Sequence, residues 1–225
     1  MTSAAIEKSY DVGPASGGEV KSIVVMLHGV GSNGQDLISL APFWAESLPD
    51  TLFVSPDAPF ACDMVPEGYP NSYQWFSLQS RDPHDMLKGV EDTMPIVEHF
   101  LDALLEKHGV SADKLALLGF SQGTMTSLYV GPRYSKKIAG ILGYSGALIG
   151  GEGLAQDPDE FHRMPIHLIH GEADDVVPVE MYGHAKEQLG AAGYTVTGGT
   201  TPNLTHGIDE AGIQSGGEFL KSIFE

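Results

Sequence analysis

The sequence predicts an α/β fold with a doubly wound, mostly parallel sheet and helices on both of its faces. Short apolar, β-branched runs recur along the chain and alternate with longer segments of helical period. Because parallel strands need crossover connections of helical length, this alternation indicates parallel pairing with helices on both sides. The 225 residues are enough for one sizeable core, so we expect a single domain, 1–225.

The composition excludes several classes of partner. Thirty acidic against twelve basic residues give a formal charge of −18, which repels nucleic acid and anionic membrane surfaces. We therefore expect no nucleic-acid partner and no stable membrane association, and no window is apolar enough for a membrane span. The charge fits either a well-solvated surface or adaptation to a saline medium. Residues 1–10 lack the apolar core of a signal peptide and Cys62 is the single cysteine, so the cytoplasm is the expected location.

The first part of the chain contains a strand, a glycine loop and a helix. Residues 11–20, rich in Gly, Pro and Ser, are interpreted as a mobile lead-in or an edge hairpin, and the apolar run 22–27 predicts a strand that is buried on both faces. The glycine-rich loop 28–34 lacks the Lys-Ser/Thr ending of a P-loop and the G-x-G-x-x-G spacing of a dinucleotide site. Nucleotide binding is therefore rejected, and we expect His28 to brace the loop. Apolar spacing then predicts a helix over 36–48.

The next segment contains a long stretch without periodicity. A short strand is predicted over 51–54, and residues 60–88 are predicted to form a long loop that proline and glycine interrupt repeatedly. Loops of this length inside compact domains usually have a function. Trp75 and Phe76 in this loop fit two roles equally, as core residues beneath the loop or as the lining of a substrate pocket. A helix is predicted over 89–108.

The rest of the chain is organised around a sharp turn. The apolar run 115–118 is followed by Gly119-Phe120-Ser121-Gln122-Gly123 and a helix-compatible stretch, 122–130. In a G-x-S-x-G turn between strand and helix, the serine sits at a strained tip that raises its hydroxyl clear of the sheet. The remaining segments are predicted as strand 138–144, loop 145–164, strand 165–170, helix 179–189, strand 194–197, loop 205–207 and helix 209–224.

A nucleophilic serine requires an imidazole that takes its proton and a carboxylate that orients the imidazole. In α/β-hydrolases the three groups follow in the order Ser, Asp or Glu, His, each after a strand. Asp174 follows the strand that ends at His170, and His206 lies beyond the last predicted strand, so Ser121, Asp174 and His206 fit in order and placement. Asp175 is the alternative acid.

A metal site is the other chemistry that this region could suggest. His167, His170, Glu172 and Asp174 are all of ligand type. Residues three apart on a strand face opposite sides, however, and the same segment is explained as a loop that carries the acid. We therefore expect no metal and no cofactor, and His170 is disfavoured as the base because it precedes the acid in the chain.

Nearly the whole chain resembles the carboxylesterase and phospholipase family of α/β-hydrolases, which includes lysophospholipases and acyl-protein thioesterases. The resemblance is carried by Leu27–Gly31, Trp75–Phe76, Gly119–Gly123, His170–Pro178 and Thr205–Gly207. It implies Ser121 as nucleophile, Asp174 as acid, His206 as base, and the backbone N–H groups of Val30 and Gln122 as the oxyanion hole. The sequence departs from the family at Ser77, where many relatives carry an acidic residue. Relatives are often dimers, so the resemblance makes a homodimer an option.

Taken together, these features predict a cofactor-free serine carboxylesterase that acts on a small-molecule ester. The strands and helices leave no insertion large enough for a separate lid domain, so acyl chains of short to medium length are expected. We expect the acyl pocket to include Met64, Trp75, Phe76 and Val177. The alternatives are a thioesterase or lysophospholipase with the same triad, because the triad does not distinguish leaving groups, and a non-catalytic receptor on the same scaffold.

Overall fold

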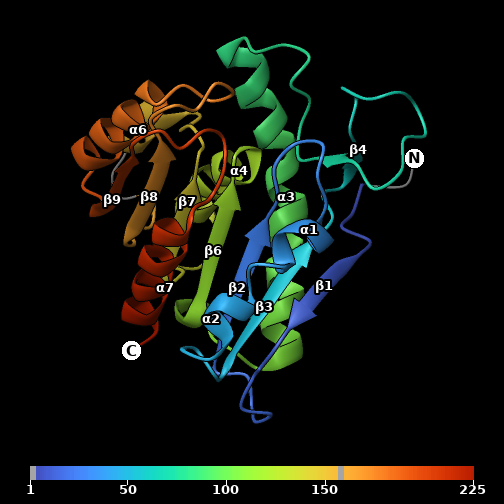
Figure 1. Ribbon diagram of the computed structural model, residues 1–225. Helices are drawn as coiled ribbons and strands as arrows, with labels where there is room; N and C mark the ends of the chain where they lie inside the picture. Colours follow the sequence, from blue (N-terminus) through green and yellow to red (C-terminus); the bar gives the residue numbers. More distant parts are fainter. Residues whose placement is uncertain (1–3, 157–159) are drawn as a thin grey trace.

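The computed structural model describes residues 4–156 and 160–225 of the chain, and its centre is a seven-stranded sheet (Figure 1). Its strands are β1 (Ser9–Val12), β2 (Ser22–Leu27), β3 (Thr51–Pro56), β6 (Leu115–Phe120), β7 (Gly140–Tyr144), β8 (Ile166–Gly171) and β9 (Val196–Thr201). They lie in the order β1-β3-β2-β6-β7-β8-β9, and only β1 pairs antiparallel to its neighbour. The predicted α/β architecture with a mostly parallel sheet is confirmed.

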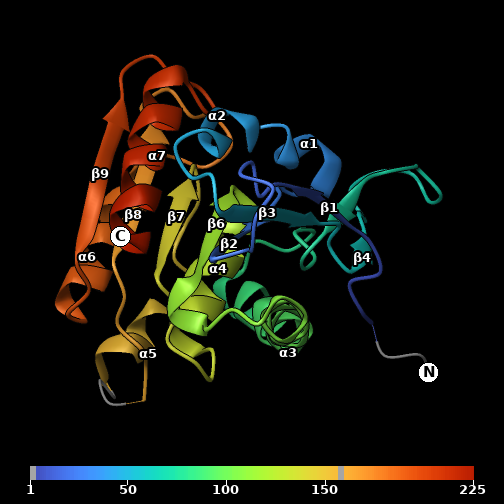
Figure 2. The same ribbon diagram turned by 90° about the horizontal axis from the view of Figure 1, so that it is seen from below.

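Helices cover both faces of this sheet. They are α1 (Gly34–Ile38), α2 (Pro42–Ala45), α3 (Pro83–His108), α4 (Gln122–Arg133), α5 (Gly151–Gln156), α6 (Glu180–Ala191) and α7 (Glu210–Phe224). One face is covered by α1, α2 and α7, and the opposite face by α3, α4, α5 and α6 (Figure 2). Alternate residues of β2 explain why both faces are covered, since Val24 and Met26 pack on the first face and Ile23 and Val25 on the second.

The helix predicted over 36–48 is instead two short helices, α1 and α2. Pro42 is the first residue of α2, and its ring nitrogen cannot donate to a carbonyl of the preceding turn. Between the helices the backbone forms tighter i→i−3 bonds, such as those from Leu40 to Leu37 and from Ala41 to Ile38. The helical spacing of apolar residues is therefore present over 36–48, but Pro42 divides the segment into two helices.

The loop predicted over 60–88 is also shorter than expected. Two short strands, β4 (Phe60–Ala61) and β5 (Tyr73–Gln74), pair inside it, and α3 starts at Pro83. Asp82 caps this helix by accepting a hydrogen bond from the His84 N–H, and proline is well suited to the first helical position. The sequence thus contained a helix-start signal that periodicity did not show.

Other boundaries move by smaller amounts. The predicted loop 145–164 contains α5, while residues 157–159 of that loop lie outside the described residues. The segment interpreted as a lead-in or edge hairpin contains the end of the edge strand β1, and the last strand is centred further along the chain than 194–197. Helix α4 continues three residues beyond the predicted end at 130, and β7 starts two residues later than predicted.

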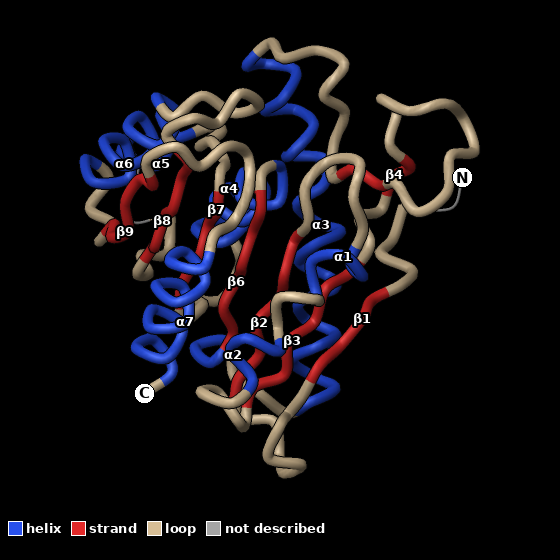
Figure 3. Tube along the Cα trace, viewed as in Figure 1, coloured by secondary structure: helices blue, strands red, loops and turns tan. Residues whose placement is uncertain are grey.

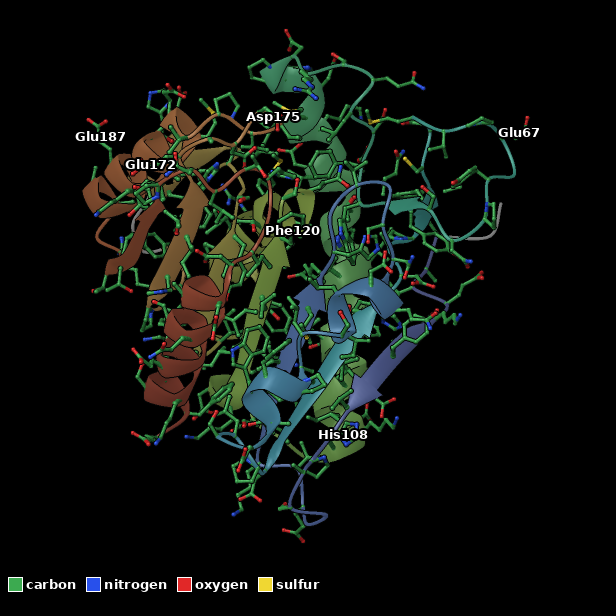
Figure 4. All side chains as sticks on the ribbon, viewed as in Figure 1. Glu67, His108, Phe120, Glu172, Asp175 and Glu187 are labelled. Carbon is green, nitrogen blue, oxygen red and sulfur yellow. The ribbon has the colours of Figure 1, made fainter. Side chains whose placement is uncertain are left out.

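The carboxyl ends of the parallel strands all lie at the same end of the sheet, where long connecting loops meet (Figure 3). Phe120, at the end of β6, lies at this end of the sheet together with Glu172 and Asp175, which follow β8 (Figure 4). His108 lies at the opposite end of the molecule. Across residues 4–156 and 160–225, no helix is long and apolar enough to cross a membrane.

Candidate active site

Ser121 occupies the turn between β6 and α4 and is buried. Its backbone has φ 54° and ψ −117°, a conformation that is strained for a residue with a side chain. A Cβ atom on Gly123 would overlap the carbonyl oxygen of Leu27, and one on Gly119 would overlap the amide of Thr124. The two glycines are thus required by the close approach of α4 to the sheet, and the predicted turn geometry is observed.

The loop after β2 is held by His28. The buried imidazole donates from Nδ1 to the Gly29 carbonyl at 2.7 Å and accepts at Nε2 from the Ala58 N–H at 3.0 Å. These partners require the neutral tautomer with the proton on Nδ1. Burial lowers the pKa of His28, outweighing the opposing hydrogen bond to Gly29. His28 therefore braces the loop, as predicted, and has no free nitrogen with which to act as a base.

Two backbone amides near Ser121 are free to bind an anion. The Gly31 N–H donates to the Tyr73 carbonyl at 2.8 Å and is therefore occupied. In the described part of the chain, the N–H groups of Val30 and Gln122 make no hydrogen bond to another residue. An amide at the first turn of a helix lacks a helical partner and is suited to binding negative charge.

The side chain of Gln122 has a role that the sequence did not reveal. Its Oε1 accepts from the Trp75 N–H at 3.0 Å, and its Nε2 donates to the Phe76 carbonyl at 2.7 Å. The indole Nε1 of Trp75 donates to the His28 carbonyl at 2.9 Å. Trp75 and Phe76 are 0% and 2% exposed, which favours the core role for both rather than the lining of a pocket. No local pattern in the sequence signals the two hydrogen bonds of the Gln122 side chain, because the bonded residues are more than forty positions apart.

Asp174 and His206 meet across two neighbouring loops. His206 donates from Nδ1 to Oδ2 of Asp174 at 2.8 Å, while Oδ1 accepts from the N–H groups of Val176 and Val177. Burial acts to raise the pKa of Asp174, but the hydrogen bonds from His206, Val177 and Val176 outweigh it and lower that pKa. Asp175 is exposed and makes no contact of this kind with His206 among the described residues.

Backbone contacts fix the two loops to each other. The Glu172 N–H donates to the Thr201 carbonyl and the Ala173 N–H to the Leu204 carbonyl, both at 2.9 Å. The His206 ring then lies over the end of β6, with its centroid 4.9 Å from that of Phe120. Within the described residues the Ser121 hydroxyl makes no hydrogen bond to His206. In enzymes without substrate, such bonds are often long and tighten when substrate binds.

His170 is placed beneath this pair rather than in it. Its Nε2 donates to the Val177 carbonyl at 2.8 Å and lies 3.3 Å from Oδ2 of Asp174. The imidazole is buried, so it holds the loop that carries the acid. This placement agrees with the expectation that His170 is not the base.

The remaining predicted residues are scattered. Val177 is buried beside Asp174, whereas Met64 is 54% exposed on the connection between β4 and β5. Across 4–156 and 160–225, no group of three or more His, Cys, Asp or Glu side chains is positioned to hold a metal ion.

Known proteins of two kinds are similar to this chain. The crystal structure of esterase PE8 matches it with a TM-score of 0.86 and 37% identity, covering 96% of this chain and 98% of that one. Esterase YpfH of Escherichia coli is 29% identical over 197 residues, which are 86% of this chain and 79% of that protein. Acyl-protein thioesterase 1 of Gibberella zeae is 29% identical over 194 residues, with coverage of 81% and 82%.

The family model described as phospholipase/carboxylesterase matches residues 14–224, which is nearly the whole chain. The relatives and the family model agree with the resemblance seen in the sequence motifs. The chain belongs to the phospholipase/carboxylesterase family, a group of serine hydrolases that includes esterases and acyl-protein thioesterases.

Proposed function

We propose that this protein is a serine carboxylesterase that hydrolyses esters with short to medium acyl chains through an acyl-enzyme intermediate. The observation that supports the proposal is the strained turn at Ser121, whose neighbour Phe120 packs against an imidazole that is held by a buried carboxylate. Each part of the reaction can be assigned to one group in this arrangement.

The nucleophile of the proposal is the hydroxyl of Ser121. His206 donates from Nδ1 to Asp174, so its Nε2 is the basic nitrogen and is available to take the serine proton. As the hydroxyl oxygen bonds to the acyl carbon, the proton passes to Nε2 and then to the oxygen of the leaving alcohol. Asp174 stays ionised, because its pKa is lowered, and stabilises the imidazolium that forms.

The negative oxygen of the tetrahedral intermediate requires hydrogen-bond donors. We assign this role to the N–H groups of Val30 and Gln122, which have no other partner in the described chain. Fixed donors in a buried site stabilise the transition state without having to reorganise. Water then attacks the acyl-enzyme by the same steps, and the serine is released. No cofactor takes part in this scheme.

The expected length of the acyl chain rests on what covers the site. We propose the connection between β3 and α3 as the cover, and its aromatic pair, Trp75 and Phe76, is already buried in the core. Exposed Met64 remains available to contact a substrate. Each methylene buried in a groove adds about 0.8 kcal/mol, so kcat/KM should rise with chain length and fall when the groove ends.

A thioesterase or lysophospholipase activity is the second candidate. The thioesterase option is supported by the similarity to acyl-protein thioesterase 1 of Gibberella zeae. The same serine, imidazole and carboxylate serve all of these reactions, because they act on the acyl carbonyl. Matched oxygen esters and thioesters of one acyl chain would distinguish these activities by their kcat/KM values.

The central test is stoichiometric labelling by a fluorophosphonate, followed by kinetics on p-nitrophenyl esters from acetate to palmitate. We expect labelling on Ser121 and a maximum at a short or medium chain, with no jump in rate at the micelle threshold. Absence of labelling would indicate a non-catalytic receptor. A maximum at palmitate, or a rate jump at the threshold, would show that the connection acts as a lipase lid.

A further inference from the structure

A groove of about 280 Å³ lies beside the serine turn, between α1 and the loop that carries His206. Leu40 and Ile208 provide apolar walls, and Phe120 and Gly29 form the end nearest the turn. Ser32 and Asp36 lie on its polar side, where the Ser32 hydroxyl donates to Asp36 Oδ2 at 2.9 Å. The proposed mechanism does not use this groove.

The groove adjoins the reacting groups. A Cβ atom on Gly29 would lie 3.3 Å from the Cβ of Ser121 and 3.2 Å from Cδ1 of Phe120, so Gly29 is in direct contact with both residues. The Phe120 ring in turn lies against the His206 ring, with centroids 4.9 Å apart. Ile208 follows His206 by two residues. A molecule in the groove would therefore lie against residues that adjoin both Ser121 and His206.

The position of His206 determines which half of the substrate lies there. The imidazole must hand its proton to the atom that leaves, so the leaving group has to lie on the His206 side of Ser121. Phe120 is shared by the groove and the His206 contact, and it places the groove on that side. Resting on the proposed esterase function, we propose that this groove binds the leaving alcohol or thiol and selects apolar groups without negative charge, with cations favoured.

The chemistry of the lining sets this preference. The leucine, isoleucine and phenylalanine side chains of the lining provide apolar surface against which an apolar leaving group can pack. Asp36 is the carboxylate of the lining, and no lysine or arginine is among the described residues that line the groove. The formal charge of −18 acts in the same direction over longer distances. An anionic leaving group would therefore meet repulsion from both sources.

The test compares three butyrate esters whose alcohols are choline, the uncharged isostere 3,3-dimethylbutanol, and 3-hydroxypropanesulfonate. Asp36→Asn should lower the choline-to-neutral ratio of kcat/KM about two- to fivefold and raise the sulfonate-to-neutral ratio similarly. Molar salt should reduce both effects. The matched control is Asp113→Asn, an equal change in charge on an exposed residue at the other end of the sheet, which should leave the ratios unchanged.

A second variant tests the apolar wall without changing charge. Leu40→Ala should lower the ratio of kcat/KM for dimethylbutyl over methyl butyrate about threefold, whereas Phe43→Ala, an exposed neighbour outside the groove, should not. If Asp36→Asn and Asp113→Asn gave the same choline-to-neutral and sulfonate-to-neutral ratios of kcat/KM, and Leu40→Ala had no effect, this inference would be overturned. The esterase proposal would not be affected by that result. Absence of hydrolysis of every ester by the unaltered protein would overturn the esterase proposal and this inference with it.

Discussion

Two parts of the connection between β3 and α3 differ sharply, although few residues separate them. At β5 and just beyond it, Trp75 and Phe76 are buried and hydrogen-bonded to the serine turn through Gln122. Before β5, Met64 and Tyr69 are 54% and 59% exposed, and Glu67 lies at a tip that is far from Phe120 (Figure 4). One connection therefore supplies both a fixed support for the site and a surface that faces solvent.

This difference shows that proximity in sequence to an aromatic motif does not decide what a residue does. The deciding feature is whether its backbone is bonded to the serine turn. Substitutions in the fixed part should cost stability and activity together, whereas those in the exposed part should change substrate preference alone. Four predictions test this contrast.

The largest effect is expected at the reacting groups themselves. Ser121→Ala and His206→Ala should each lower kcat by about four orders of magnitude or more, and the double variant should lose little beyond either one, because members of a triad act as a unit. Steady-state kinetics of the three variants on p-nitrophenyl butyrate measures this. Losses that multiply in the double variant would show that the two residues act independently. Asp174→Asn should also reduce the rate strongly, with Asp175→Asn as its matched control.

Gln122→Ala should give the second largest effect, on stability. Removing the side chain leaves the Trp75 N–H and the Phe76 carbonyl buried without their partner, and each unpaired group costs about 1–3 kcal/mol. We therefore expect the free energy of unfolding to fall by about 2–6 kcal/mol in urea denaturation. The rate per folded molecule should fall far less than in Ser121→Ala, since the oxyanion hole uses the amide of residue 122.

The control for this variant is Gln79→Ala in the same connection. Gln79 is exposed and, among the described residues, its side chain donates only to the Asp63 carbonyl, so the loss of that side chain should cost under about 0.5 kcal/mol. Similar small losses of stability in both variants would mean that the hydrogen bonds of the Gln122 side chain do not hold Trp75 and Phe76 in place.

A third, smaller effect is the dependence of stability on pH. The pKa of buried His28 is lowered, mainly by desolvation, so below its ordinary value of about 6.5 the unfolded chain binds a proton that the folded chain does not. The free energy of unfolding should therefore be steady above that pH and fall below it, by up to about 1.4 kcal/mol per pH unit. His28→Asn should reduce this slope in urea titrations from pH 8 to 5. An unchanged slope would exclude His28 as its source, and exposed His84→Gln serves as the control.

The smallest effects are expected in the exposed part. Met64→Ala should change the free energy of unfolding by less than about 0.5 kcal/mol. If Met64 contacts the acyl chain, kcat/KM for octanoate should fall about two- to fourfold relative to acetate. Glu67→Gln, in the same exposed stretch, is the control. An equal change for both esters would remove Met64 from the acyl groove.

Most of the sheet and the serine turn could be predicted because their signals are local. Strands such as 22–27 are continuous apolar runs, and the turn at Ser121 needs glycine on both sides. The helix boundaries that were predicted wrongly are those where single residues outweigh the apolar periodicity. Pro42 divides a helix whose apolar spacing continues, and Asp82 with Pro83 starts α3 before that spacing becomes visible.

Interactions between distant segments could not be predicted in the same way. The side chain of Gln122 bonds to residues 46 and 47 positions away, and no pattern in the sequence distinguishes it from an exposed glutamine. The same holds for His28, whose tautomer depends on the Ala58 amide. Order along the chain predicted Asp174 as the acid, because the motif places an acid after a particular strand, and the structure shows this carboxylate, rather than that of Asp175, against His206.

The position of β9 has a consequence for how the molecule would lose its function under stress. This strand forms one edge of the sheet, all of its residues are partly or fully exposed, and the loop beyond it carries His206. Sheet edges with few buried contacts open at lower free energy than the centre. Trp44 and Trp75, by contrast, lie in the buried interior. Mild denaturant should therefore produce a population that keeps its native tryptophan emission but has lost the proposed esterase activity, because the loop that carries His206 has detached together with β9.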